Sequence, residues 1–213
     1  MRTVRLAHIA TALTLGLAAC SSGDAETKPP SDAELMTRSD MPSAGWTVNT
    51  EESSEWDSGL TEPYSVHICG PDVATLKMFP EFSDLEHVDR VLSGGSGSVA
   101  EVVFAGTSEE LAEVYESVTR KLGECLADPQ EMVDPPLTDD GFDVTASPLP
   151  SFGLGLGDFR LRQQIAELNC DHRMALVLMD SRLAIVELSD HDDQFADADF
   201  ETLVEKAVRQ TDA

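Results

Sequence analysis

Basic residues are scarce in this sequence, and their scarcity excludes one large class of partner. The 213 residues include 14 Lys and Arg against 40 Asp and Glu, which gives a formal net charge of −26. A field of this sign repels the phosphates of nucleic acids and the headgroups of anionic lipids. Nucleic-acid binding is therefore excluded. We interpret the acidity as a source of solubility or as adaptation to a salt-tolerant host, rather than as a device for binding cations.

The sequence also lacks an apolar run long enough to cross a bilayer comfortably, which takes about 20 residues. The run from Leu6 to Ala19 is shorter and is interrupted by polar residues. It follows Arg2 and Arg5 and ends in small residues. A positive start, a short apolar region and a small-residue exit are typical of an export signal.

The end of this signal, Leu17-Ala18-Ala19-Cys20, resembles the lipobox of bacterial lipoproteins. In that family the cysteine thiol receives a diacylglyceryl group, the signal is cut before it, and the new amino terminus is often acylated. The alternative is an ordinary signal peptide with an incidental cysteine. Cleavage would leave 12 basic and 40 acidic residues, a net charge of −28. The expected location is the outer face of the cytoplasmic membrane, with a lipid anchor on Cys20.

Three regions follow from this interpretation. Residues 1–19 are the predicted lipoprotein signal peptide, residues 20–32 the lipidated cysteine with a flexible tether, and residues 33–213 a single domain. Ser21 to Ser31 contain two prolines and no apolar side chain larger than alanine, as expected of a linker. The chain is 41% hydrophobic, which is enough for a real core.

The clearest element is a helix that begins after Thr107. Thr107 and Glu110 have the spacing of a capping box, in which each side chain satisfies a free backbone N–H group near the other. Asp128-Pro129 ends the predicted helix. Its apolar residues recur at helical spacing and predict a buried stripe, consisting of Leu111, Val114, Tyr115, Val118, Leu122, Cys125 and Leu126.

Strands are predicted from alternation of apolar and polar residues at residues 64–69, 98–105, 142–146 and 158–168. Two nearly continuous apolar runs, 174–179 and 183–188, predict a hairpin in the middle of a sheet. A final helix over residues 200–208 is preceded by Asp197 and Asp199 as caps. These elements predict an α+β fold, a mainly antiparallel sheet packed against two principal helices.

Two other segments are harder to interpret. Residues 72–92 carry apolar positions at helical spacing, and Pro80 prevents one continuous helix. The Pro- and Gly-containing turn before Trp46 is expected to direct that side chain inward. Trp56 lies in the polar, acidic stretch 49–62 and is a candidate contact residue, unless it folds back on the core.

Motifs for catalysis and cofactors are missing. The sequence has no Gly-x-Ser-x-Gly elbow, and no pair of acids stands out among 40. Gly153 to Gly157 imitates a phosphate loop, but a strand-like stretch follows, so we interpret it as a bend. The acidic runs 190–193 and 139–143 lack the ligand spacing of an EF-hand and are interpreted as solvated loops. We therefore expect no enzyme activity, no catalytic residue, no metal and no cofactor.

The elements follow one another in a recognisable order. They are the lipobox, the opening motif from Leu35 to Trp46, Cys69-Gly70 at a strand end, strand 98–105, a helix containing Cys125, Gly157-Asp158, and a hairpin before a terminal helix. This order resembles the PknH-like extracellular domain family, which comprises the sensor domain of an actinobacterial serine/threonine kinase and free-standing lipoproteins built on it. The likeness covers about residues 33–211. Ser43-Ala44 adds one residue to the family's Leu-x-x-x-x-x-Pro-x-Gly-aromatic opening.

The resemblance implies a disulfide between Cys69 and Cys125, which an exported compartment would preserve. Such a bridge would stabilise the fold by about 4 kcal/mol in the chain-entropy model. Cys170 then remains as a buried thiol or a partner for another chain, and Cys125–Cys170 is the competing pair. A zinc site from His67, Cys69, Cys170 and His172 is a further alternative.

Two functions of different classes fit this sequence. The first is a lipid-anchored sensor or binding domain for a small molecule or cell-envelope component. The second is an interaction module that docks an envelope protein, with Trp56 as a contact. An envelope hydrolase is a third alternative. The chain has no kinase domain, so any signal would pass through a partner.

The lipid anchor predicts a specific mass. The protein recovered from membranes should begin at Cys20 and carry the mass of a diacylglyceryl group, and Cys20→Ser should abolish both the added mass and the cleavage before residue 20. Intact-mass spectrometry of the two proteins checks this. A Cys20→Ser protein that still carries the added mass would contradict the anchor.

Overall fold

The computed structural model describes part of the chain, residues 27–48, 82, 85–95, 97–129, 144–165, 169–191 and 194–212. The signal, Cys20, Trp56, Cys69 and the predicted strand 64–69 lie outside these residues. No helix among the described segments is long and apolar enough to span a membrane.

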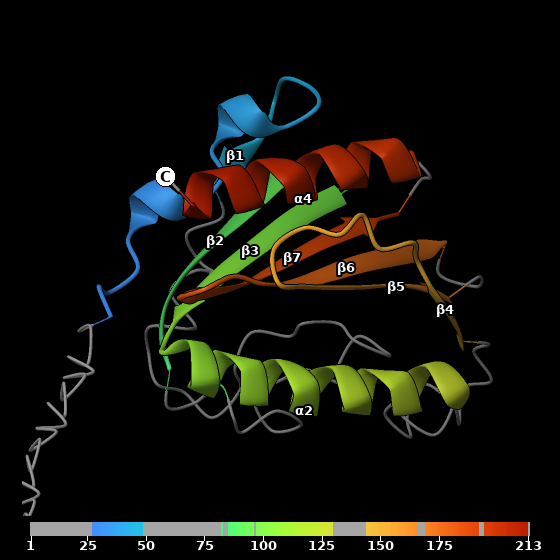
Figure 1. Ribbon diagram of the computed structural model, residues 1–213. Helices are drawn as coiled ribbons and strands as arrows, with labels where there is room; N and C mark the ends of the chain where they lie inside the picture. Colours follow the sequence, from blue (N-terminus) through green and yellow to red (C-terminus); the bar gives the residue numbers. More distant parts are fainter. Residues whose placement is uncertain are drawn as a thin grey trace, which may run out of the picture.

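The described residues form a single α+β domain around one antiparallel sheet, which confirms the predicted fold class (Figure 1). Seven strands pair in the order β1-β2-β3-β7-β6-β5-β4. They are β1 (Thr47–Val48), β2 (Glu86–Gly94), β3 (Gly97–Ala105), β4 (Val144–Pro148), β5 (Gly157–Ile165), β6 (Cys170–Leu178) and β7 (Arg182–Asp190). Two α-helices, α2 (Ser108–Ala127) and α4 (Asp197–Thr211), and two 3₁₀ turns, η1 (Asp32–Glu34) and η2 (Arg38–Asp40), complete the described elements.

The two α-helices cover opposite faces of the sheet, so the core has two layers (Figure 1). Side chains of a strand alternate between faces. In β7, Ala184 and Val186 face α4, whereas Leu183 and Ile185 face α2. The predicted hairpin of β6 and β7 is confirmed, and β7 is the middle strand. Its nearly continuous apolar sequence follows from burial on both faces.

Helix α2 confirms its predicted boundaries. Thr107 Oγ1 accepts a hydrogen bond from the Glu110 N–H, and Glu110 Oε2 accepts one from the Thr107 N–H at 2.9 Å. Asp128 ends the helix. The prediction for α4 is correct only in part. Asp199 accepts from the Ala196 N–H at 2.9 Å, but Asp197 is the first helical residue and contacts arginines of the sheet instead.

The interpretation of residues 72–92 as interrupted helix is wrong for its last part, because Glu86 to Gly94 form strand β2. The helical spacing was that of Val73, Leu76, Phe79 and Phe82, all of which precede the strand in the sequence. The whole strand pairs with β3 and returns through a turn at Gly95, whose φ is +62°. Pairing with an adjacent apolar strand therefore overrides the local pattern.

The segment before β1 is fixed to the sheet by polar contacts. Arg182 Nε donates to Glu34 Oε2 at 2.7 Å, and Arg90 Nη1 donates to the Met36 carbonyl at 2.8 Å. Trp46 is 5% exposed and packs edge-on against Phe195, which confirms its inward direction. These contacts hold the start of the domain beside α4.

Glu101 of β3 is an ionisable residue whose burial changes its protonation. Its side chain accepts from the Met36 N–H at 2.5 Å, and the residue is 2% exposed. Burial raises the pKa of Glu101 from 4.5 to about 8, although the Met36 hydrogen bond and the charge of Arg90 act in the opposite direction. The folded protein therefore holds a proton here that the unfolded chain has lost between about pH 4.5 and pH 8.

Stability should fall as pH rises through this window, because the folded state binds more protons than the unfolded state. The slope due to Glu101 is at most about 1.4 kcal/mol per pH unit. Glu101→Gln should flatten the profile, since an amide keeps the acceptor for Met36 and does not ionise. Urea unfolding of both proteins from pH 5 to pH 8 checks this, and parallel profiles would contradict it.

Candidate functional site

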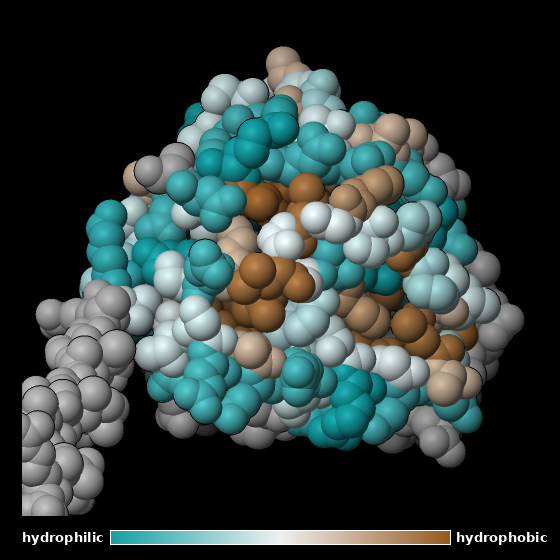
Figure 2. Space-filling model, in the orientation of Figure 1, coloured by the Kyte–Doolittle hydropathy of each residue, from teal (hydrophilic) through white to brown (hydrophobic). Residues whose placement is uncertain are grey.

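A hollow lies where the first turn of α4 meets β5 and the loop that joins β4 to β5. We call it the α4 pocket. Its cavity volume is about 120 Å³. Figure 2 shows apolar side chains exposed on this face, in the band between the two helices. The pocket is lined by Leu149, Pro150, Phe152, Arg160, Asp197, Ala198, Phe200 and Glu201.

A buried ion pair forms the base of the pocket. Asp158 and Arg160 are two residues apart on β5, so strand alternation directs both side chains to the same face. Arg160 Nε donates to Asp158 Oδ1 at 2.7 Å, and Arg160 Nη2 donates to Oδ2 at 3.2 Å. Each side chain is 1% exposed. A paired, two-point geometry of this kind is what makes burial of both charges tolerable.

The same carboxylate shapes the glycine-rich loop. Asp158 Oδ2 accepts hydrogen bonds from the Phe152 N–H at 2.9 Å and from the Leu154 N–H at 3.2 Å. Gly155 has φ +60°, and a Cβ there would lie 2.2 Å from the Leu178 carbonyl oxygen. The interpretation of this stretch as a bend rather than a phosphate loop is confirmed, because a strand follows it and the protein's own carboxylate occupies these N–H donors.

One nitrogen of the Arg160 guanidinium takes no part in the ion pair with Asp158. Nε and Nη2 both face Asp158, so Nη1 is the corner of the guanidinium that points away from the ion pair. Nη1 is buried and has no hydrogen-bond partner. The ring of Phe152 stacks over the guanidinium, with 4.2 Å from Cζ to the ring centroid. An unsatisfied buried donor costs about 1–3 kcal/mol, which is a reason to look for its partner outside the chain.

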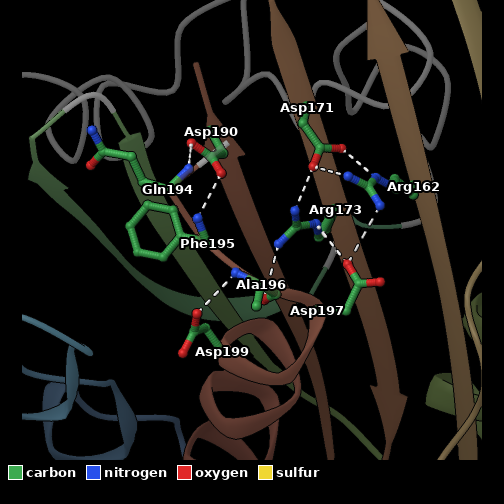
Figure 3. Close-up of polar contacts among 9 residues, drawn as sticks. All are labelled: Arg162, Asp171, Arg173, Asp190, Gln194, Phe195, Ala196, Asp197 and Asp199. Atoms are coloured by element: carbon green, nitrogen blue, oxygen red, sulfur yellow. Dashed lines mark hydrogen bonds and ion pairs between the residues drawn. The ribbon is translucent and has the colours of Figure 1, made fainter. Parts of the chain in front are cut away.

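A second charged cluster adjoins the pocket through Asp197 (Figure 3). Asp171 accepts two hydrogen bonds from Arg162, both at 2.7 Å, and one from Arg173 Nη2 at 2.6 Å. Arg173 Nη1 donates to the Ala196 carbonyl at 3.2 Å. Asp197 Oδ1 lies 3.3 Å from Arg173 Nε and 3.6 Å from Arg162 Nη1. These contacts fix the start of α4 against β5 and β6.

The chain leading into α4 is held by Asp190. Its carboxylate accepts from the Gln194 N–H at 3.1 Å and from the Phe195 N–H at 2.9 Å (Figure 3). The interpretation of residues 190–193 as a solvated loop is therefore wrong for Asp190, which is buried and holds this connection. Within the described segments, no three His, Cys, Asp or Glu side chains are grouped as metal ligands.

The structure leaves the residues predicted from the sequence largely untested. Cys20, Cys69 and Trp56 lie outside the described residues. Cys125 belongs to helix α2 and Cys170 begins strand β6, but their side chains are not among those described. The Cys69–Cys125 disulfide and its alternatives, including the zinc site, therefore stay predictions.

The sequence analysis did not identify three residues of this site, Asp158, Arg160 and Phe152. One signal was available, an acid and a base separated by one residue in a stretch of period two, within a chain that has only 14 basic residues. That pattern predicts a same-face pair. It does not show that the pair is buried or which loop crosses it.

A serine and a histidine also meet, but away from the pocket. Ser189 Oγ lies 2.7 Å from His172 Nδ1. The two residues are directly opposite each other on β7 and β6. Alternation from Ile185 and Met174 places them on the α2 face of the sheet, whereas the pocket is on the α4 face. We interpret the contact as a cross-strand hydrogen bond.

Comparison with known proteins leaves the family of this chain open. No protein-family model matches it, and no curated protein sequence matches it. A solved structure with some similarity is the crystal structure of the extracellular domain of PknH from Mycobacterium tuberculosis, at a TM-score of 0.49 and 12% sequence identity. The alignment covers 87% of this chain and 96% of that chain. A likeness at this level concerns the fold at most and carries no functional argument.

The buried Asp158–Arg160 ion pair predicts that a single substitution of Asp158 strongly destabilises the fold. Asp158→Asn removes the negative charge and leaves Arg160 buried without compensation, which should lower the free energy of unfolding by roughly 3–5 kcal/mol. Hydrogen exchange should also accelerate at the amides of Phe152 and Leu154. Glu205→Gln is the control, because it removes the exposed Glu205–Arg209 pair and should cost less than about 1 kcal/mol. Equal effects of the two changes would contradict the assignment.

Proposed function

We propose that this chain is a lipid-anchored, extracytoplasmic ligand-binding domain of the sensor type, without catalysis of its own. The N-terminal sequence supports the location, since it has the features of an export signal and ends in Leu17-Ala18-Ala19-Cys20, which resembles a lipobox. The anchor would hold the domain at the outer face of the cytoplasmic membrane. In this proposal the domain passes its signal to a partner.

The observation that carries the proposal is the buried, unpaired Nη1 of Arg160, a residue that lines the α4 pocket. Ligand sites in proteins typically combine an apolar lining with a few fixed polar groups. The α4 pocket has this composition, because Phe200, Leu149 and Pro150 accompany the Arg160 guanidinium. The Asp158 contacts fix Arg160 in advance, so binding would require little ordering of that side chain.

A second candidate is an interaction module that docks another envelope protein. It is favoured by two large apolar side chains of the β4–β5 loop, Phe152 at 46% and Leu156 at 67% exposed. Exposed aromatic residues are enriched at protein interfaces. Trp56, the contact residue suggested by the sequence, lies outside the described residues.

Native mass spectrometry of the full chain, purified from its host in detergent without reduction, tests the proposal. The protein should carry an added mass that is lost on denaturation, beyond the covalent lipid mass that remains. Ala198→Leu fills the pocket without changing charge and should abolish the added mass. Thr202→Leu, an exposed change on the same helix outside the pocket, should retain it.

A protein that carries no non-covalent mass from its own host would contradict ligand binding. A specific co-purifying protein that is lost on Leu156→Ser and retained in Ala198→Leu would favour the interaction module.

A further inference from the structure

We infer that the α4 pocket takes a neutral amide group, whose carbonyl oxygen accepts from Arg160 Nη1 and whose N–H donates to a carboxylate at the start of α4. This inference rests on the proposed ligand-binding function and specifies its chemical class. Arg160 of the sheet and two carboxylates of the helix, Asp197 and Glu201, line the α4 pocket, and the Nη1 of Arg160 is buried without a hydrogen-bond partner.

The charge balance of the pocket disfavours an anionic ligand. The positive charge of Arg160 is already matched by Asp158 at 2.7 Å. A carboxylate or phosphate placed at Nη1 would approach that buried anion and the carboxylates of Asp197 and Glu201. Repulsion between like charges is strong where water is excluded. The mature chain, at a net charge of −28 after loss of residues 1–19, adds a repulsive long-range field.

A simple cation is disfavoured by the Arg160 guanidinium on the sheet side of the pocket. It would pair with Asp197 or Glu201 on the helix but would place a positive charge beside the Arg160 guanidinium. It would also leave Nη1 without an acceptor. A neutral carbonyl oxygen satisfies Nη1 without adding charge, and a neighbouring N–H satisfies a carboxylate. An amide carries both groups in one rigid plane.

Asp197 is positioned to serve as this acceptor. Its contacts with Arg162 and Arg173 are made through Oδ1, and its side chain is 63% exposed. The other oxygen therefore faces a more open environment at the first turn of the helix. Glu201 follows one turn later and lines the same pocket. The two carboxylates thus offer acceptors at the helix side of the pocket.

The size and apolar lining match one acyl-amide group rather than a whole drug-sized molecule. The cavity volume is about 120 Å³, and ligand pockets of drug-sized molecules are about 300–1,000 Å³. Phe200, Leu149 and Pro150 would contact the methyl or methylene carbon of the acyl group. The remainder of the ligand would extend past Phe152, which is half exposed at the pocket's edge.

Titration of the full chain with three probes of similar size tests the inference by ligand-observed NMR. The probes are N-methylacetamide, acetate and methylammonium. N-methylacetamide should bind, and acetate and methylammonium should bind at least about tenfold more weakly. Acetate is repelled by the neighbouring carboxylates, and methylammonium leaves the buried Nη1 donor unpaired. Ala198→Leu should abolish binding, and Thr202→Leu should preserve it.

Arg160→Lys is the decisive variant, since lysine keeps a positive charge for Asp158 but has one donor nitrogen in place of the three nitrogens of the guanidinium. It should weaken N-methylacetamide binding about tenfold, as expected for loss of a charge-assisted hydrogen bond. A thermal unfolding scan of the same variant verifies that it is folded. Asp197→Asn with Glu201→Gln should also weaken the amide probe, which separates the helix contacts from the sheet contact.

Two sources of the amide are distinguished by larger probes, N-acetylglucosamine for an envelope glycan and N-acetyl-alanine-methylamide for a peptide. Tighter binding of either one than of N-methylacetamide identifies the source and supports the inference. Preferential, pocket-dependent binding of acetate or methylammonium would overturn the amide class and leave ligand binding intact. Absence of binding by all amide probes would overturn the inference, while the native mass experiment decides separately whether any ligand is present.

Discussion

The ion pair between Asp158 and Arg160 is the interaction on which the α4 pocket depends. Burial of two charges carries a desolvation cost that only good geometry offsets. Here the carboxylate accepts from two nitrogens of Arg160 and from two backbone N–H groups of the β4–β5 loop. One residue therefore positions the sheet side of the pocket and the loop that covers it.

The topology explains why the pocket forms at this place. Strands β5 and β4 lie at one end of the sheet order, and the first turn of α4 is tied to the arginines of β5 and β6. The apolar residues of α4 pack over the middle of the sheet. The helix start and the loop therefore meet over charged residues, where apolar packing gives way to polar contacts.

Much of this fold could be predicted from the sequence, and the reasons differ between elements. The capping box of Thr107 and the two apolar runs of β6 and β7 are local signals, and both were correct. Strand β2 was missed because the helical spacing of the apolar residues before it was extended through residue 92, whereas pairing with β3 makes residues 86–94 a strand. The pocket combines Phe152, Arg160 and Asp197 from three elements, so it follows from strand order and loop path. Neither the strand order nor the loop path can be predicted from the spacing of charged residues in a chain with 40 acidic residues.

The most direct measurement of the central claim is ¹⁵N NMR of the Arg160 guanidinium during titration with N-methylacetamide, assigned with Arg160→Lys. The account predicts separate, slowly exchanging Nη resonances, because the ion pair restricts rotation about the Nε–Cζ bond, and a selective shift of the Nη1 resonance as the amide binds. Averaged Nη resonances, as in a freely rotating arginine, or an Nη1 resonance that does not move while the amide binds, would contradict it.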